Sequence, residues 1–163
     1  AEGRLQRIEP EILPGDLLLI QFTHNDTSEL VWRHTDPWTS FRHNLEIFVD
    51  TAQLRGARPV LMTPICRRYW REGVLLPSHG DYPEVIRVLA ARRNIPLIDL
   101  YEKSVRLVQE LGEEESKRLY LHVEPGIYPA YPEGSADDTH TKRAGAEAYA
   151  RMTAEALRAL GLI

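Results

Sequence analysis

The stretch that decides the fold lies at residues 17–26 and reads LLLIQFTHND. Its first six residues are apolar except for Gln21, which is typical of a strand covered on both faces of a parallel sheet. The four polar residues 23–26 follow at once. Ligands bind outside the carboxyl ends of the strands in open α/β sheets. This junction therefore predicts both a buried strand and a candidate functional site.

Two further apolar runs and three helical patterns continue the chain. The runs at residues 60–62 and 97–100 are also short and nearly continuous, as buried strands are. Elsewhere, apolar residues recur at the 3.6-residue spacing of amphipathic helices. Strands that alternate with helices predict βαβ units, right-handed crossovers and a parallel sheet, and hence an α/β fold class. The predicted strands are residues 17–22, 60–62 and 97–100, and the predicted helices are residues 41–54, 83–93 and 142–160, the last ending at Gly161.

The beginning of the chain departs from this alternation. A helix-like stretch at residues 4–12 leads to the turn at residues 14–16 (PGD), with no strand pattern before it. Three strands are also few for a sheet that usually has about five or six. We therefore expect the first βα unit of the fold to be missing from these 163 residues, as in an amino-terminally truncated domain. Residues 112–116 predict a solvated helix end or turn, and residues 123–138 predict a long irregular loop of the kind that is often functional.

Composition bounds the class of protein. A length of 163 residues favours one domain spanning residues 1–163, and 43% hydrophobic with 27% charged residues excludes disordered, collagen-like and coiled-coil chains. With 20 basic against 24 acidic residues, the net charge of -4 argues against a nucleic-acid partner. No apolar run approaches the ~20 residues of a membrane span, so no membrane partner is expected. The single cysteine, Cys66, excludes an internal disulfide, predicts a buried core residue and fits a cytoplasmic location.

The polar cluster after the first strand holds a candidate oxyanion donor. Asn25 can aim a side-chain amide at negative charge that develops on a carbonyl oxygen. The alternative interpretation is a plain turn, because Asn and Asp form hydrogen bonds with their own backbone in turns. The position of the cluster favours neither interpretation.

A second polar cluster, DDTH at residues 137–140, precedes the last predicted helix. Asp137 can fold back and accept the Nδ1 proton of His140, which leaves Nε2 as a general base. The alternative is an N-terminal cap for the following helix, where Asp and Thr are favoured. The spacing alone does not separate these two roles.

Several other residues could serve a site, but a nucleophile is absent. His79 lies in a polar loop before a predicted helix, and Arg67 and Arg68 follow the second strand, where they could meet an anionic sugar or form a solvated face. The sequence contains neither serine-nucleophile motif, G-x-S-x-G or Gly-Asp-Ser. It also contains no HExxH zinc motif, no P-loop and no GxGxxG nucleotide-binding motif. The candidate substrate-binding residues are His24, Asp26, His79 and Arg67.

Taken together, these motifs resemble the SGNH (GDSL-type) hydrolases, specifically their rhamnogalacturonan acetylesterase branch. Each motif is weak alone, but their order is specific and spans nearly the whole chain. The motifs are PGD at 14–16, QFTHND at 21–26, TP at 63–64, HGDYP at 79–83, LIDL at 97–100, PGIYP at 125–129, DDTH at 137–140 and GA at 145–146.

The resemblance implies a fold, a reaction and three catalytic roles. The family has a three-layer α/β/α sandwich with a flavodoxin-like parallel sheet of about five strands. By position, Asn25 matches an oxyanion-hole donor, His140 the catalytic base and Asp137 the acid that orients it. The family needs no metal or other cofactor, and its typical members remove acetyl groups from pectic or related polysaccharides and oligosaccharides.

Two departures from the family pattern matter. Thr23 stands where the family usually has glycine, and the Gly-Asp-Ser block with the second-block glycine is absent. We therefore expect a carbohydrate acetylesterase whose nucleophile lies outside these residues, so that the chain alone is a poor esterase. An exposed sheet edge would also favour a homo-oligomer. The alternatives are a non-catalytic carbohydrate-binding or assembly module, and a metal-dependent phosphoesterase using His24, Asp26, His79, Asp81 and His140.

Overall fold

The computed structural model describes residues 3–163, which form two compact units. The first unit comprises residues 3–64 and 79–99, and the second comprises residues 65–78 and 100–163. Among the described residues, no helix combines the length and the apolar character needed to cross a membrane.

The first unit is built on a parallel sheet in the order β1-β2-β5. Leu19 pairs with Val60 across the first two strands, and Leu61 pairs with Leu97 across the next two. The three predicted strands are confirmed, although the last is shorter than predicted because Leu100 already begins a helix. The strands are β1 (Leu17–Gln21), β2 (Arg58–Met62) and β5 (Leu97–Ile98).

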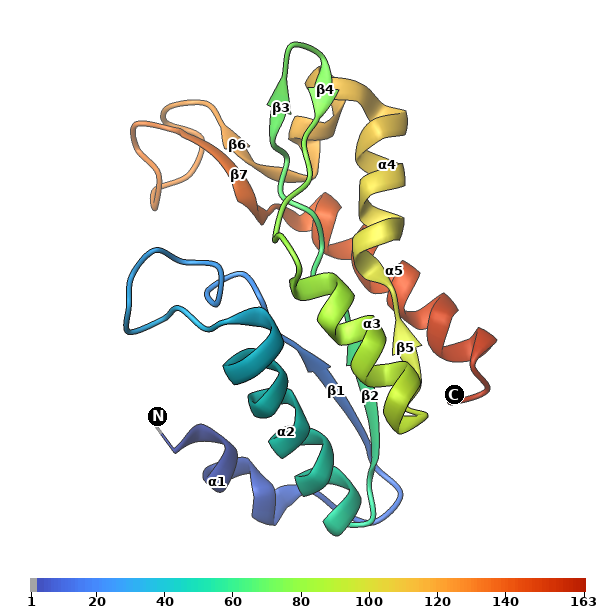
Figure 1. Ribbon diagram of the computed structural model, residues 1–163. Coiled ribbons are helices and arrows are strands. Elements are labelled where there is room, and N and C mark those ends of the chain that lie inside the picture. The colour runs from blue at the N-terminus through green and yellow to red at the C-terminus, as the bar shows by residue number, and fades with distance from the viewer. Residues whose placement is uncertain (1–2) are drawn as a thin grey trace. The chain divides into compact units, whose positions relative to one another are not determined.

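Two helices, α2 (Arg42–Leu54) and α3 (Tyr82–Arg93), cover one face of this sheet (Figure 1). Their apolar stripes pack on Ile20 and Leu61 of the strands, as the 3.6-residue pattern predicts. A turn of π-helix, η2 (Pro37–Phe41), leads into α2, and the short elements α1 (Arg4–Ile8) and η1 (Glu9–Glu11) precede the sheet. The core side chains are Ile20, Phe41, Leu45, Val49, Leu61, Tyr82, Val85, Ile86, Leu89, Ala90 and Ile95.

The second unit packs helices and hairpins around a buried Tyr120. Its hydroxyl donates to the Cys66 carbonyl oxygen at 2.7 Å and accepts from the Tyr149 hydroxyl at 3.1 Å. Cys66 is buried as predicted, and this burial raises the pKa of its thiol. The elements are β3 (Trp70–Arg71), β4 (Val74–Leu75), α4 (Leu100–Glu115), η3 (Ser116–Arg118), β6 (Tyr120–Val123), β7 (Ser135–Thr141) and α5 (Arg143–Ala159).

The predicted bounds of the irregular loop, residues 123–138, are wrong at both ends. Val123 closes β6 and Ser135 opens β7, and the two strands pair antiparallel, so only residues 124–134 connect them. Most residues of β7 are polar, so the strand lacks the apolar alternation by which strands are predicted from sequence. The helix α4 was not predicted, and Gly112, with φ +75°, interrupts it inside the segment predicted as a helix end or turn.

Thr23 holds a backbone conformation that favours glycine. Its φ is +127°, in a region that costs a side-chain-bearing residue about 1–3 kcal/mol. The residue is 1% exposed, and its hydroxyl has no hydrogen-bond partner among the described residues. Because threonine stands here in place of the usual glycine, the end of β1 carries backbone strain and a buried hydroxyl oxygen that is unpaired in the described chain.

We predict that Thr23→Gly raises the free energy of unfolding by about 1 kcal/mol. Glycine relieves the positive φ and removes the unpaired hydroxyl, and these gains exceed its entropic cost of about 0.5–1 kcal/mol. Urea unfolding measures the change. Thr23→Ala is the control, because it removes the hydroxyl but keeps Cβ and the strain. A glycine variant less stable than the alanine variant would contradict this prediction.

Candidate active site

Asp137 and His140 form a hydrogen-bonded pair within β7. The Oδ2 atom of Asp137 lies 2.6 Å from Nδ1 of His140, as the D-x-x-H spacing predicts. The alternative role as a helix cap is wrong, because the N-cap of α5 is Lys142 and no side chain caps it. A proton on Nδ1 donates to the carboxylate and leaves Nε2, at the opposite edge of the ring, as an acceptor. The pair can therefore act as a general base with its orienting acid.

A break in the β6–β7 ladder brings these two side chains together. Leu121 pairs with Asp137 while the adjacent Tyr120 pairs with Thr141, so residues 138–140 loop out of the ladder. Such bulges bend a strand and redirect its side chains. The backbone then folds over the Asp137 carboxylate, whose Oδ1 accepts from the N–H groups of Thr139 at 2.7 Å and His140 at 2.9 Å.

These contacts favour the ionised form of the Asp137 carboxyl. Burial raises its pKa, but hydrogen bonds from the His140 backbone, the His140 ring and the Thr139 backbone outweigh that effect, and the net pKa lies below the ordinary value. An ionised carboxylate is the form that stabilises an imidazolium. The His140 side chain is 76% exposed, so a reacting group has access to it.

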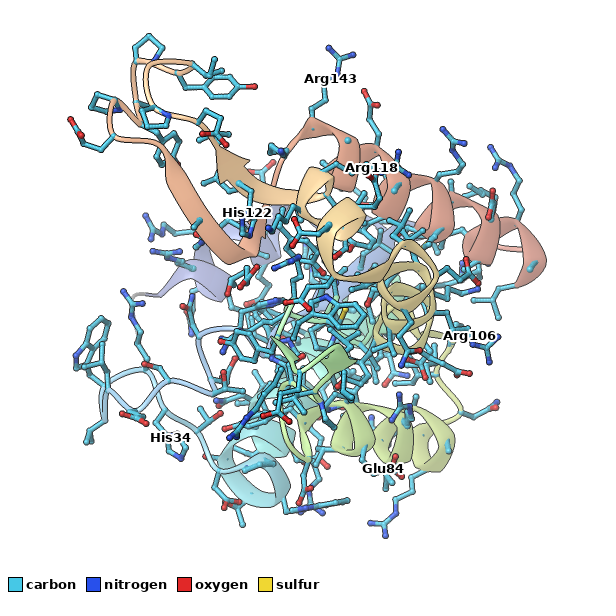
Figure 2. The ribbon with its side chains drawn as sticks, turned by 90° about the horizontal axis from the view of Figure 1, so that it is seen from above. His34, Glu84, Arg106, Arg118, His122 and Arg143 are labelled. Atoms are coloured by element: carbon cyan, nitrogen blue, oxygen red, sulfur yellow. The ribbon has the colours of Figure 1, made fainter. Side chains whose placement is uncertain are left out.

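Asp138 and Arg68 lie beside this pair, and sequence reasoning assigned neither of them to it. Arg68 is 4% exposed, so the prediction of a solvated face is wrong for this residue. Its Nη1 donates to Oδ1 of Asp138 at 2.7 Å, and Nε2 of His122 lies 2.7 Å from the same oxygen. Figure 2 shows His122 on the β6 strand. The repeated Asp in DDTH was the only sequence signal for this contact, since Arg68 is 70 residues away.

Asn25 and Asp26 follow β1 in the first unit. The Asp26 carboxylate accepts from the Thr23 N–H and the Thr35 hydroxyl, both at 3.0 Å, so the turn interpretation is confirmed for Asp26. Asn25 is exposed, and its Oδ1 accepts from Nη1 of Arg33 at 3.4 Å. The role of Asn25 as an oxyanion donor stays a prediction.

His24 and His79 meet edge to face in the same unit. Their ring centroids are 4.5 Å apart with an interplanar angle of 74°. His79 is 5% exposed and has φ +75°, so it is held in a conformation that non-glycine residues rarely adopt. The Asp81 carboxylate that follows accepts from Nε1 of Trp38 at 3.0 Å.

Arg67 belongs to the second unit, with Asp137 and His140. Its backbone N–H donates to the Ser78 hydroxyl at 3.0 Å, and its Nη1 donates to the Tyr69 hydroxyl at 3.1 Å. Within residues 3–163, no three His, Cys, Asp or Glu side chains gather as a metal-binding group requires. The phosphoesterase alternative therefore has no ligand cluster in the described part of the chain.

Comparison with known proteins identifies the family. The chain is 43% identical to the rhamnogalacturonan acetylesterase RhgT of Bacillus subtilis, over 99% of this chain and 68% of that protein. It is 36% identical to YesY of the same organism, named a probable rhamnogalacturonan acetylesterase, over 99% of this chain and 70% of that protein. No family model matches the chain.

Solved structures agree on the fold. The crystal structure of YxiM from B. subtilis is 28% identical, with a TM-score of 0.77 over 98% of this chain and 41% of that chain. An acetyl-xylooligosaccharide esterase from Geobacillus has the same fold, with a TM-score of 0.63 at 16% identity over 94% of this chain and 65% of that chain. The predicted fold class, a three-layer α/β/α fold with a parallel sheet, is therefore confirmed. By its identity to the acetylesterases over 99% of its length, the chain belongs to the rhamnogalacturonan acetylesterase family of SGNH hydrolases.

Proposed function

We propose that this chain supplies the general base and an oxyanion donor of a serine acetylesterase that acts on an acetylated pectic or related saccharide. The observation that carries the proposal is the 2.6 Å contact between Asp137 and His140, which leaves Nε2 of His140 as the base. The relatives named as rhamnogalacturonan acetylesterases support the substrate class. No Gly-Asp-Ser occurs in the 163 residues, so a segment outside them would carry the nucleophile.

The proposed reaction follows from these roles. Nε2 of His140 accepts the serine hydroxyl proton as the serine oxygen attacks the acetyl carbonyl carbon. Asp137 stabilises the resulting imidazolium, and the Asn25 amide donates to the oxyanion of the tetrahedral intermediate. Collapse of the intermediate breaks the bond to the sugar oxygen, which takes the proton from His140. Water then repeats the sequence on the acetyl-serine and releases acetate.

The free edge of β1 is the proposed docking site for the nucleophile-bearing strand. In the described chain β1 pairs with β2 alone, and Leu19 and Phe22 are 44% and 41% exposed. A cavity of about 590 Å³, formed by residues that follow β1 together with α1 and α2, is lined by Phe22, Phe48, Asn25 and Trp32, among others. A parallel strand paired here would end at the same sheet edge as β1, close to the turn that carries Asn25.

Substrate contacts are assigned to His24, His79 and Arg67. Imidazole and guanidinium groups offer hydrogen bonds to sugar hydroxyls and carbonyls. Asp26 remains a predicted substrate contact. Its carboxylate also accepts hydrogen bonds from Thr23 and Thr35, and we assign it in addition to holding the Asn25 turn in place.

We predict that the chain alone hydrolyses acetyl esters poorly and that an upstream segment bearing Gly-Asp-Ser restores turnover. Activity is measured as acetate release from acetylated rhamnogalacturonan and from p-nitrophenyl acetate. In the restored protein, His140→Ala should abolish activity, and Asn25→Ala should lower kcat by about 10²–10³. His34→Ala is the control, since this exposed histidine contacts the Ser28 carbonyl outside the site. Unchanged turnover in His140→Ala would contradict the mechanism, and saccharide binding without turnover would favour the non-catalytic module.

Asp137→Asn tests the orienting carboxylate. We expect kcat to fall by about 10³–10⁴, because an amide can hold the imidazole in the wrong tautomer. The folded-state pKa of Asp137 is below its unfolded value, so its stabilising effect is present above pH ~4 and is lost as the pH falls through the folded pKa. Urea midpoints measured from pH 6 to pH 2 should therefore drop less steeply in Asp137→Asn than in the wild type. Parallel pH profiles would contradict this.

The free β1 edge also predicts self-association of the chain on its own. Unpaired strand edges and exposed apolar side chains drive strand pairing between molecules. Light scattering should detect a dimer or larger assembly, and Leu19→Lys, a charge placed on the edge strand, should shift it toward monomer. Leu54→Lys is the control, because Leu54 is 87% exposed and belongs to α2 rather than to the edge strand. A monomer at high concentration would contradict the prediction.

A further inference from the structure

Arg68 stands at the centre of a buried polar network next to the Asp137–His140 pair. Its Nη1 donates to Oδ1 of Asp138 at 2.7 Å, and its Nε donates to the Ser116 hydroxyl at 3.0 Å. Its Nη2 donates to the Glu113 carbonyl oxygen, and its backbone N–H donates to the Asp138 carbonyl oxygen at 2.8 Å. All these groups belong to the second unit.

We infer that Arg68 is a positioning residue for the base: through Asp138 it fixes the looped-out residues 138–140 and thereby holds Asp137 against His140. The inference rests on the proposed function, in which His140 is the base. Arg68 itself acts on the pair through Asp138, with its own donors directed at Asp138, Ser116 and Glu113.

Because Arg68 is buried, its charge and its donors must be matched by neighbouring groups. The Arg68 side chain is 5% exposed, and a guanidinium so far from water is tolerated only when its charge and its donors are matched. Asp138 supplies the charge, and the other two acceptors come from the end of α4 and from η3, where Ser116 is 0% exposed. Its planar fork therefore has little freedom to turn, because Ser116 and Glu113 hold the donors that are not bonded to Asp138.

Asp138 is held at two points, and this fixes the bulge. Its Oδ1 contacts both Arg68 and His122 at 2.7 Å, while its backbone carbonyl accepts from the Arg68 N–H. Residue 138 is the first residue after the Leu121–Asp137 pair, where the strand leaves its ladder. With Asp138 held there, the chain is directed back over the Asp137 carboxylate, and the N–H groups of Thr139 and His140 reach Oδ1.

Hydrogen exchange tests the inference without requiring turnover. In the 163-residue chain, NMR measures exchange of the Thr139 and His140 amides, which donate to Asp137. We expect Arg68→Lys, which keeps the charge but loses the fork, to speed their exchange at least about tenfold relative to the amides of Val108 and Tyr149 in the same unit. Arg143→Lys is the matched control, since Arg143 lies three residues after His140 in the sequence. Its side chain is 91% exposed, points into solvent and binds only Glu147 among the described residues (Figure 2).

Each result has a defined meaning. Selective acceleration at Thr139 and His140 in Arg68→Lys alone supports positioning by Arg68. Unchanged exchange, or equal acceleration at all four amides in a folded variant, overturns it. If Arg68→Lys does not fold, Asp138→Asn takes its place, because it keeps the shape and one acceptor oxygen but loses the charge that holds the fork. The same selective acceleration is then expected, and its absence overturns the inference.

A second arm separates this inference from the proposed function. In the protein that carries a Gly-Asp-Ser segment, Arg68→Lys should lower kcat on p-nitrophenyl acetate about tenfold with KM unchanged. An unchanged kcat despite faster exchange overturns the catalytic part of the inference. Absence of turnover in the wild-type protein overturns the proposed function, while the exchange result still decides whether Arg68 holds the bulge.

Discussion

A carboxylate and an imidazole three residues apart in one strand can meet only if that strand leaves its ladder. Side chains alternate between the two faces of a regular strand, so residues at i and i+3 point in opposite directions. The looped-out residues 138–140 remove this constraint and allow the 2.6 Å contact between Asp137 and His140. Much of the surrounding structure follows from the need to hold an irregular backbone in one shape.

The same principle operates after β1. There the chain leaves the strand through Thr23, with a positive φ, and closes a turn around the Asp26 carboxylate. Strained backbone persists only where its surroundings determine it fully, and it gathers at functional sites. In both units, then, an aspartate that accepts at least one backbone N–H stabilises the irregular segment. Asn25 and His140, the residues with proposed chemistry, stand on those segments and are exposed.

The strands, the amphipathic helices and the Asp137–His140 pair were predictable because their signals are local. Apolar runs and 3.6-residue spacing located β1, β2, α2 and α3, and a three-residue spacing suggested the pair. The β6–β7 hairpin was missed because most of β7 is polar. The role of Arg68 could not be predicted, since its burial depends on an aspartate 70 residues away and on the end of α4, a helix that was missed although its apolar residues recur at helical spacing.

Cys66 gives this chain an internal probe of its own opening. It is the single cysteine of the sequence, it is 1% exposed, and it lies in the core of the second unit beside Tyr120. A buried thiol with a raised pKa reacts only after its surroundings separate and water enters. The rate at which a thiol reagent labels the protein therefore reports the opening of the unit that carries His140, separately from any motion of the unit that carries Asn25.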